Sequence, residues 1–303
     1  MDPNQVDLHV HTEGTSPYKK GDANLAPYHA AGARHGLKLL AITDHYHYVT
    51  QPVRYVLRQR RWIDDFSRGK SATEPPRMLL GVEQTIFRGG RLDLRRATKR
   101  ALDLVVLSVH WFGVGTPGFV GGTRLGRQHV ERLGQWLSSG HERGARFLRH
   151  LERARVGALL NRKVRDLPRV LGHPWSNLLS RGLFFPALLE SAGRVLEVAG
   201  REGAAFELND GSCRQLLDAI EADGPGAFPG TLPAARFVED LFGLLVDHDV
   251  PLSVGSDAHV LSDVGRVGSA VELLCWAGQR VPRAGRLRVV GDGFLSPRTR
   301  AQL

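Results

Sequence analysis

The sequence predicts an α/β protein, a barrel built from about seven βα units. Short apolar runs alternate with longer segments of helical periodicity, the pattern of repeated strand–helix units. Histidines and carboxylates gather where these runs end, and in an α/β barrel the strand ends share one face. The length of 303 residues suits either one such barrel with extensions or two smaller domains.

The first strand is predicted over 6–11, where apolar residues alternate with polar ones. His9 and His11 lie two residues apart, so a strand would direct both imidazoles to the same side. One metal ion can be held between two such nitrogens. The pair alone is weak evidence, because a structural or surface pair has the same spacing.

The other elements are predicted from apolar runs, helical periodicity and turn residues. Strands are expected at 37–43, 78–83, 104–109, 169–172, 204–209 and 251–255. Helices are expected at 24–35 (with Gly36 as its stop), 52–67, about 126–165 and about 264–278. The Gly-rich segment 113–125 is expected to be a loop. With no internal repeat and no clear linker, we predict one domain over 1–303, with a less assignable helical insertion at about 113–168 and a basic tail from about 279 that contains one apolar patch at 287–290.

The composition predicts a soluble globular protein, with 42% hydrophobic and 24% charged residues. No run of about 18 apolar residues is present, and the first residues lack the basic and apolar regions of a signal peptide. Cys213 and Cys275 are the two cysteines, which argues against a disulfide framework or a thiolate zinc site. We therefore expect a cytoplasmic protein.

The net charge of +10 is compatible with nucleic acid, acidic membranes or phosphorylated substrates as partners. Of the 41 basic residues only six are lysines, however, and an arginine excess of this kind can also reflect genome composition. Nucleic acid therefore stays an alternative partner, and no membrane partner is expected.

Clusters of metal-type ligands lie at or just beyond the ends of the predicted strands. Each cluster alone has a structural explanation, such as a helix cap at Asp44 or an ion pair at Glu83. Together they favour a metal centre, and histidine with carboxylate suits zinc, manganese or iron without a thiolate. The clusters are His9 and His11; Thr43-Asp44-His45; Glu83; His110; His173-Pro174; Glu207 with Asn209; and Ser256-Asp257-Ala258-His259.

This ordered set resembles the PHP (polymerase and histidinol phosphatase) family of metal-dependent phosphoesterases, from residue 6 to about 275. The matching motifs are His9-Val-His11-Thr12, Thr43-Asp44-His45, Gly81-Val-Glu83, Ser108-Val-His110, Gly172-His173-Pro174, Phe206-Glu-Leu-Asn209 and Gly255-Ser-Asp257-Ala-His259. The resemblance implies a distorted (βα)7 barrel with two or three divalent ions (Zn, Mn or Fe) at the C-terminal ends of the strands.

The resemblance also implies roles for individual residues. His9, His11, Glu83 and Asp257 would hold a first ion, Glu83 with His110 and His173 a second, and His45 with His259 a third. Catalytic roles would belong to Asp257, Glu83 and His259, with a metal-bound hydroxide as nucleophile. The sequence departs from the family at 13–17, where an Asp or His is usual and Glu-Gly-Thr-Ser-Pro stands here. We therefore expect the third ion to be absent, weak or differently liganded.

Further residues are candidates for supporting the ligands and for binding phosphate. Asp44, Glu207 and Asn209 are expected to support ligands rather than bind metal. The candidates for holding phosphoryl oxygens are Arg88, Arg181 and Arg214, each a few residues beyond a ligand motif. The alternative for any one of these arginines is a solvated surface residue.

The leading hypothesis for function is hydrolysis of a phosphate monoester, with a histidinol phosphate-like small molecule as first candidate. The alternative is a nuclease or phosphodiesterase acting on DNA, RNA or nucleotides, favoured by the charge and by the Arg-rich stretch 146–169. A non-catalytic metal-binding barrel is a third hypothesis. A metal-dependent amidohydrolase ranks last, because those enzymes often add a bridging lysine and none of the six lysines lies at a predicted strand end.

Overall fold

The computed structural model describes residues 2–12, 25–46, 53–69, 74–110, 127–222, 224 and 226–294. The departure from the family pattern at 13–17 and the predicted loop at 113–125 lie outside the described residues. Both predictions therefore stay predictions.

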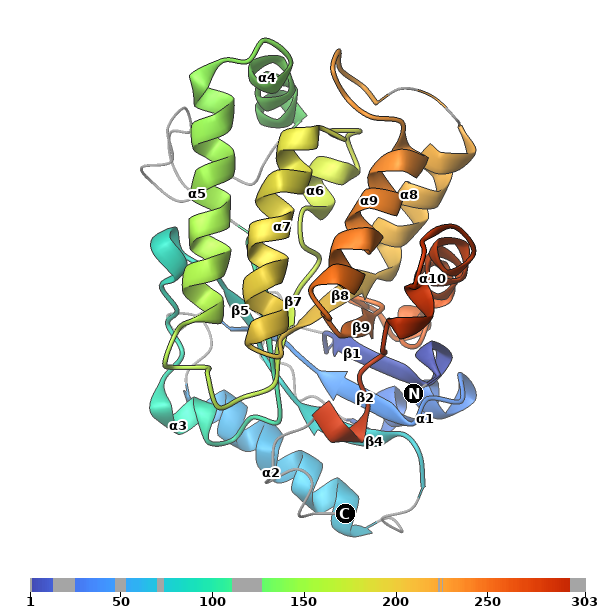
Figure 1. The fold of residues 1–303 in the computed structure, drawn as a ribbon. Helices are drawn as coiled ribbons and strands as arrows, with labels where there is room; N and C mark the ends of the chain where they lie inside the picture. The colour runs from blue at the N-terminus through green and yellow to red at the C-terminus, as the bar shows by residue number, and fades with distance from the viewer. Residues whose placement is uncertain are drawn as a thin grey trace.

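The described strands form two sheets with parallel pairing throughout, in the orders β1-β2-β4 and β3-β5-β6-β7-β8-β9 (Figure 1). Their bounds are β1 Val6–Val10, β2 Leu39–Ile42, β3 His45–Tyr46, β4 Arg77–Leu80, β5 Glu83–Thr85, β6 Val105–Ser108, β7 Arg169–Leu171, β8 Ala205–Asn209 and β9 Leu252–Gly255. The predicted strands 37–43 and 78–83 are each interrupted. The register nevertheless continues, since Ile42 faces Leu80 and His45 faces Glu83. β3 therefore prolongs β2 and β5 prolongs β4, so the described strands occupy seven positions.

β1 and β9, the first and last of these strand positions, are joined without a regular ladder of hydrogen bonds. The Asp257 amide donates to the His9 carbonyl and the His11 amide to the Ala258 carbonyl, both at 2.8 Å. Val10 and Ala258 form an isolated parallel bridge. The arrangement is a mixed α/β fold consistent with a TIM-like architecture, and regular barrel closure is not seen between β1 and β9 in the described chain.

The strands divide their apolar side chains between two clusters. The inner cluster contains strand and strand-flanking residues and lies on the face away from the helices; its members are Val6, Leu8, Leu39, Ala41, Leu79, Leu104, Val106, Val170, Ala205 and Val290. The outer cluster packs against the helices and includes the intervening residues Leu40, Ile42 and Leu80. Residues at odd positions of β2 and β4 therefore face inward, as the two-residue period of a strand requires.

β1 departs from this alternation. Its register with β2 shifts between Asp7 and Val10, an irregularity of the β-bulge type. Leu8 belongs to the inner cluster and Val10 to the outer one, although both lie on the same side of a regular strand. The shift therefore places His9 on the inner side together with Leu8.

The helices follow amphipathic patterns. On α2 the buried residues Val56, Gln59, Arg60 and Ile63 recur at helical spacing. The predicted helix at 126–165 forms two helices instead, because Gly140 has a φ of +65° and His141 caps the second helix by accepting from the Arg143 amide. The bounds are α1 Ala26–Arg34, α2 Val53–Gly69, α3 Arg96–Lys99, α4 Arg127–Ser138, α5 Glu142–Leu159, α6 Ser176–Leu179, α7 Pro186–Arg201, α8 Asp210–Glu221, α9 Ala234–Asp247 and α10 Gly268–Arg280. α5, α7 and α9 stand side by side (Figure 1).

The predicted apolar patch of the tail packs against β9. The Leu252 amide donates to the Arg288 carbonyl and the Val290 amide to the Leu252 carbonyl, both at 2.8 Å. Val290 joins the inner cluster. Among the described residues, no helix has the length and apolar character needed to cross a membrane.

Candidate metal centre

Along the strands, the inward-facing side chains change from apolar to polar toward the C-terminal end. On the line of β2 and β3 the inner residues Leu39 and Ala41 are followed by Thr43 and His45. The same change runs from Leu79 to Glu83 on β4 and β5, from Val106 to His110 after β6, and from Ala205 to Glu207 and Asn209 on β8. His173 follows β7 outside the strand alternation, with a φ of +28°. Since the strands are parallel, their polar ends meet on one side of the inner cluster.

Among the described residues, five imidazoles surround the carboxylate of Glu83, which is fully buried. From the nearer carboxylate oxygen, the distances are 2.5 Å to His45 Nδ1, 2.8 Å to His110 Nε2, 2.8 Å to His173 Nε2, 3.5 Å to His9 Nε2 and 3.7 Å to His11 Nε2. Burial favours a raised pKa, but His110 and His9 outweigh it and hold the pKa of Glu83 well below its ordinary value. An ionised carboxylate with imidazoles at both oxygens could be shared by two cations.

Asp257 joins the two histidines of β1. His11 Nε2 lies 3.1 Å from Asp257 Oδ1 and 3.2 Å from His9 Nε2. The Asn209 amide donates to Asp257 Oδ2 at 3.3 Å. Burial favours a raised pKa for Asp257, but the nearby His9 and the hydrogen bond from His11 lower it below its ordinary value. Asp257 is therefore a second ionised carboxylate of the centre.

His9 and His259 each bond through Nδ1 to an oxygen that is not a candidate metal ligand. His9 Nδ1 lies 2.7 Å from Glu207 Oε1, and His259 Nδ1 lies 2.9 Å from the Asp257 carbonyl. Because a carboxylate and a carbonyl can only accept, both Nδ1 atoms donate, so Nε2 is the atom of each ring that would bind a metal ion once the imidazole is neutral. The Glu207 carboxylate also accepts the His173 amide. Glu207 thereby orients residues from two strands, as partners of metal-binding histidines do.

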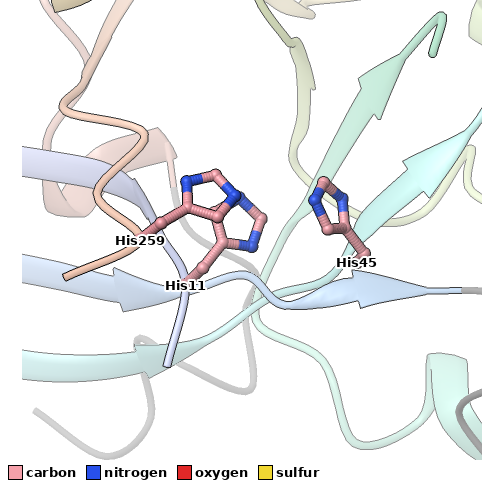
Figure 2. A group of neighbouring side chains, drawn as sticks. All are labelled: His11, His45 and His259. Atoms are coloured by element: carbon pink, nitrogen blue, oxygen red, sulfur yellow. The ribbon is translucent and has the colours of Figure 1, made fainter. Parts of the chain in front are cut away.

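Three imidazoles stand together at the edge of the centre (Figure 2). The ring centroid of His11 lies 4.4 Å from that of His45 and 4.3 Å from that of His259, whereas His45 and His259 are 5.8 Å apart. Burial lowers the pKa of His11 to about 4, against the opposing hydrogen bond with Asp257. His11 is therefore neutral at pH 7, the form of imidazole that binds metal. The family resemblance assigns His45 and His259 to a third ion. Both lie beside His11, a contact that the sequence did not indicate.

Asp44 does not face the centre. Its carboxylate accepts from the Thr12 amide at 2.8 Å, the Thr12 hydroxyl at 2.9 Å, Gln59 Nε2 at 2.7 Å and the Tyr55 hydroxyl at 3.1 Å. Burial raises its pKa in spite of these bonds. Asp44 therefore ties the end of β1 to α2. The partners Tyr55 and Gln59 were not predicted, although a polar residue in the buried stripe of an amphipathic helix is a usable signal.

The donor set fits metal ions. Glu83 Oε2 is buried and lies 2.5 Å from His45 Nδ1, but no donor among the described residues is aligned with it, and a bound cation would satisfy this oxygen. In the part of the chain that the structure describes, four groups of three residues each offer ligand atoms within 4.8 Å of one another. They are His9, His11 and Asp257; His9, Glu83 and His173; His45, Glu83 and His110; and His11, His45 and His259.

The three candidate arginines are not gathered into this cluster. Arg88, Arg181 and Arg214 are exposed, and within the described chain no hydrogen bond or ion pair joins them to the centre. Arg214 Nη2 lies 3.2 Å from Asp210 Oδ2 on the same helix. Their role toward phosphate stays a prediction.

The fold and the centre define a parallel α/β protein with clustered histidines and carboxylates suited to metal. No family model matches the sequence, and no curated protein matches it. Among solved structures, the chain is similar to a histidinol phosphate phosphatase from Lactococcus lactis subsp. lactis, crystallised with zinc, L-histidinol and phosphate. The TM-score is 0.56 at 15% identity, over 91% of this chain and 94% of that chain. This likeness shows the fold and supports the PHP-like architecture that the motifs predict.

Proposed function

We propose that the protein is a metal-dependent phosphoesterase that hydrolyses a phosphate monoester of a small molecule, with a histidinol phosphate-like compound as first candidate. The main support is the meeting of six histidines, Glu83 and Asp257 at the strand ends. The fold shared with a phosphatase crystallised with zinc and phosphate agrees with it.

The same observations support a proposal for the architecture. We propose a distorted (βα)7 barrel of the PHP type spanning 1–303 as one domain, with a helical insertion at about 113–168 and a basic tail from about 279. The seven strand positions and the bonds between β1 and β9 support it.

The ligand set divides around the shared carboxylate. His9, His11, Glu83 and Asp257 would hold one ion, Glu83 with His110 and His173 a second, and His45 with His259 a third, beside which His11 also lies. Imidazole and carboxylate donors suit zinc, manganese or iron. When bound, these ions would supply activation of water and positive charge at the phosphoryl oxygens.

The chain's own groups prepare this chemistry. Glu207 holds the Nδ1 proton of His9 and the backbone amide of His173, so the His9 imidazole and the backbone at His173 are positioned before any ligand binds. Asn209 holds Oδ2 of Asp257, whose ionised carboxylate would be able to bind a cation and orient water beside it. The His259 side chain is 55% exposed at the edge of the centre, where a substrate would arrive.

A substrate screen on one metal-loaded preparation tests the proposal. Phosphate monoesters, phosphodiesters and single-stranded oligonucleotides are compared, with Asp257→Asn and chelator-treated protein as controls. We expect hydrolysis of monoesters that chelation abolishes, that added metal restores and that the variant lacks. Cleavage of oligonucleotides alone would instead establish the nuclease alternative, and tight metal binding without hydrolysis would establish a non-catalytic metal-binding protein.

A further inference from the structure

Asp7 is a fully buried carboxylate on β1 that lies outside the ligand set. Both of its oxygens accept hydrogen bonds from groups that belong mainly to the loop after β9. The donors are the Ser256 amide at 3.0 Å and the His9 amide at 3.4 Å to Oδ1, and the Ser256 hydroxyl at 2.7 Å and the Gly265 amide at 2.9 Å to Oδ2. One side chain therefore joins the strand of His9 and His11 to a loop that lies about 250 residues further along the chain.

The contacts of Asp7 fall at the two ends of that loop. Ser256 directly follows β9, and Gly265 ends the segment 256–265, which contains Asp257 and His259. Two of the candidate metal ligands are thus held on a segment that Asp7 secures at its start and at its end.

The loop needs such an anchor for two reasons. Asp257 has a φ of +55°, a left-handed conformation that a residue with a side chain rarely adopts unless its surroundings hold it. In addition, β1 and β9 are joined by isolated bonds rather than by a regular ladder. The Ser256 hydroxyl, which donates to Asp7, also accepts the Ala258 amide at 3.2 Å, so the anchor acts on both neighbours of Asp257.

We infer that Asp7 is a positioning residue, which sets metal affinity by holding Asp257 and His259 in register with His9 and His11. The inference rests on the metal-binding part of the proposed function and needs no assumption about the substrate. An Asp7 that served stability alone would leave the metal affinity of the folded protein unchanged.

Asp210 provides a matched control, because it is also a buried carboxylate that accepts backbone amides and a serine hydroxyl. Its donors are the Ser269 amide at 2.7 Å, the Ala270 amide at 3.2 Å, Arg214 Nη2 at 3.2 Å and the Ser269 hydroxyl at 3.4 Å. These contacts fix the start of α10 and do not reach the loop of Asp257. Asp7→Asn and Asp210→Asn each remove a buried carboxylate that accepts backbone amides and a serine hydroxyl, and Asp210→Asn also removes an ion pair with Arg214. Of the two carboxylates, Asp7 is the one that holds the loop of Asp257 and His259.

The experiment is a zinc titration of the full-length, metal-stripped protein against a competing chelator, at a temperature where each variant is folded. We expect Asp7→Asn to raise at least one zinc dissociation constant by roughly 10- to 100-fold. Asp210→Asn should stay within about threefold of wild type, even where its melting temperature falls. In a background of Asp257→Ala, Asp7→Asn should weaken zinc binding by a smaller factor than it does in wild type, because one of the two ligands through which it acts is already gone.

Unchanged zinc affinity in Asp7→Asn would overturn the inference, as would equal weakening by both variants or full additivity with Asp257→Ala. If Asp7→Asn does not fold, Ser256→Ala serves in its place, because it removes the hydroxyl that donates to Asp7. Ser256→Ala is expected to weaken zinc binding by a smaller factor, and unchanged zinc affinity in this variant would also overturn the inference. Wild-type protein that binds zinc but hydrolyses no phosphate ester would contradict the proposed function and leave this inference intact.

Discussion

The two ends of the same strands have opposite chemistry. On β4 and β5, the inward-facing Leu79 belongs to the apolar inner cluster, and Glu83, four residues later, lies among five imidazoles. On β8, Ala205 and Glu207 differ in the same way over two residues. The alternation of a strand decides which side chains face inward, and the distance along the strand decides whether they meet apolar neighbours or the cluster of histidines and carboxylates that is the candidate metal centre.

This division separates stability from function. Burying an apolar side chain contributes about 1.5–3 kcal/mol each, so the inner cluster favours folding. Burying ionisable groups costs free energy unless they are paired, so the centre is kept at the expense of stability. Substitutions at the two ends should therefore have different consequences, and the predictions below test that difference.

The largest effect is expected from Glu83→Gln. The substitution keeps the size of the side chain but removes the charge that two cations would share, so metal content should fall and activity should drop by more than about 100-fold. The metal-free variant should still fold, because the apolar inner cluster is unchanged, but it should unfold at a lower temperature than metal-free wild type, because the buried imidazoles lose their paired carboxylate. Metal analysis, turnover and calorimetry on one preparation measure all three, and wild-type turnover would exclude a shared carboxylate.

Leu79→Ala tests the other end of the same strand line. Removing a fully buried leucine should cost about 2–5 kcal/mol of unfolding free energy through lost burial and the cavity left behind. Zinc affinity of the folded fraction should be unchanged. Denaturant unfolding and a chelator competition at low temperature measure the two quantities, and a parallel loss of both would show that the ends are not independent.

A change of pH should have two smaller effects of opposite sign. As the pH rises, the stability of the metal-free protein should fall and its zinc affinity should rise. Burial favours a lowered pKa for His173, but its hydrogen bond to Glu83 and the surrounding carboxylates raise it to about 9, above the ordinary 6.5. In the metal-free protein, the stability from the protonated imidazole is complete below pH 6.5 and is lost as the pH rises through 9. Metal requires the neutral imidazole, so zinc affinity should rise over the same interval, by at most about tenfold per pH unit for one released proton.

Melting temperatures of the metal-free protein and zinc competition titrations at several pH values between 6.5 and 9 test this. The melting temperature should fall by a few degrees while affinity increases. A flat profile for both would contradict the Glu83–His173 pairing.

The smallest effect is expected on the surface, from Arg149→Gln combined with Arg153→Gln on α5. Both side chains are exposed, so hydrolysis of small monoesters should stay within about twofold of wild type. Oligonucleotide affinity and its salt dependence should also be unchanged if the excess charge reflects composition. Weaker binding with a flatter salt dependence would favour the nuclease alternative. Arg155, in the same Arg-rich stretch, is unsuitable because it is buried with its guanidinium carbon 4.9 Å from the Trp175 ring centre.

The sequence predicted the strands and the gathering of the ligand candidates well, because apolar runs and the polar residues after them are local features. It did not predict the interruptions after Ile42 and Leu80. There the ladder breaks where Gly81 approaches Thr43 so closely that a Cβ at position 81 would lie 2.7 Å from the Thr43 methyl. The shift within β1 was also missed, since the residues alternate regularly and only pairing with β2 shows it.

The anchoring residues could not be found in the same way. Asp7 and Ser256 lie 249 residues apart, and nothing near Asp7 in sequence indicates which loop its carboxylate holds. The sequence feature that marks Asp7 is that it is a carboxylate in a strand whose other residues are apolar, apart from His9. Contacts of this kind depend on how distant segments meet, whereas ligand type and spacing are properties of short segments.

Anomalous diffraction from crystals grown with excess zinc or manganese tests the central claim most directly. Two strong peaks are expected on either side of the Glu83 carboxylate, one among His9, His11 and Asp257 and the other beside His110 and His173. A third peak beside His45 and His259 should be weak or missing, and full occupancy there with a ligand from 13–17 would overturn that expectation. Crystals with an ordered centre and no anomalous peak within bonding distance of Glu83 would contradict the metal centre itself.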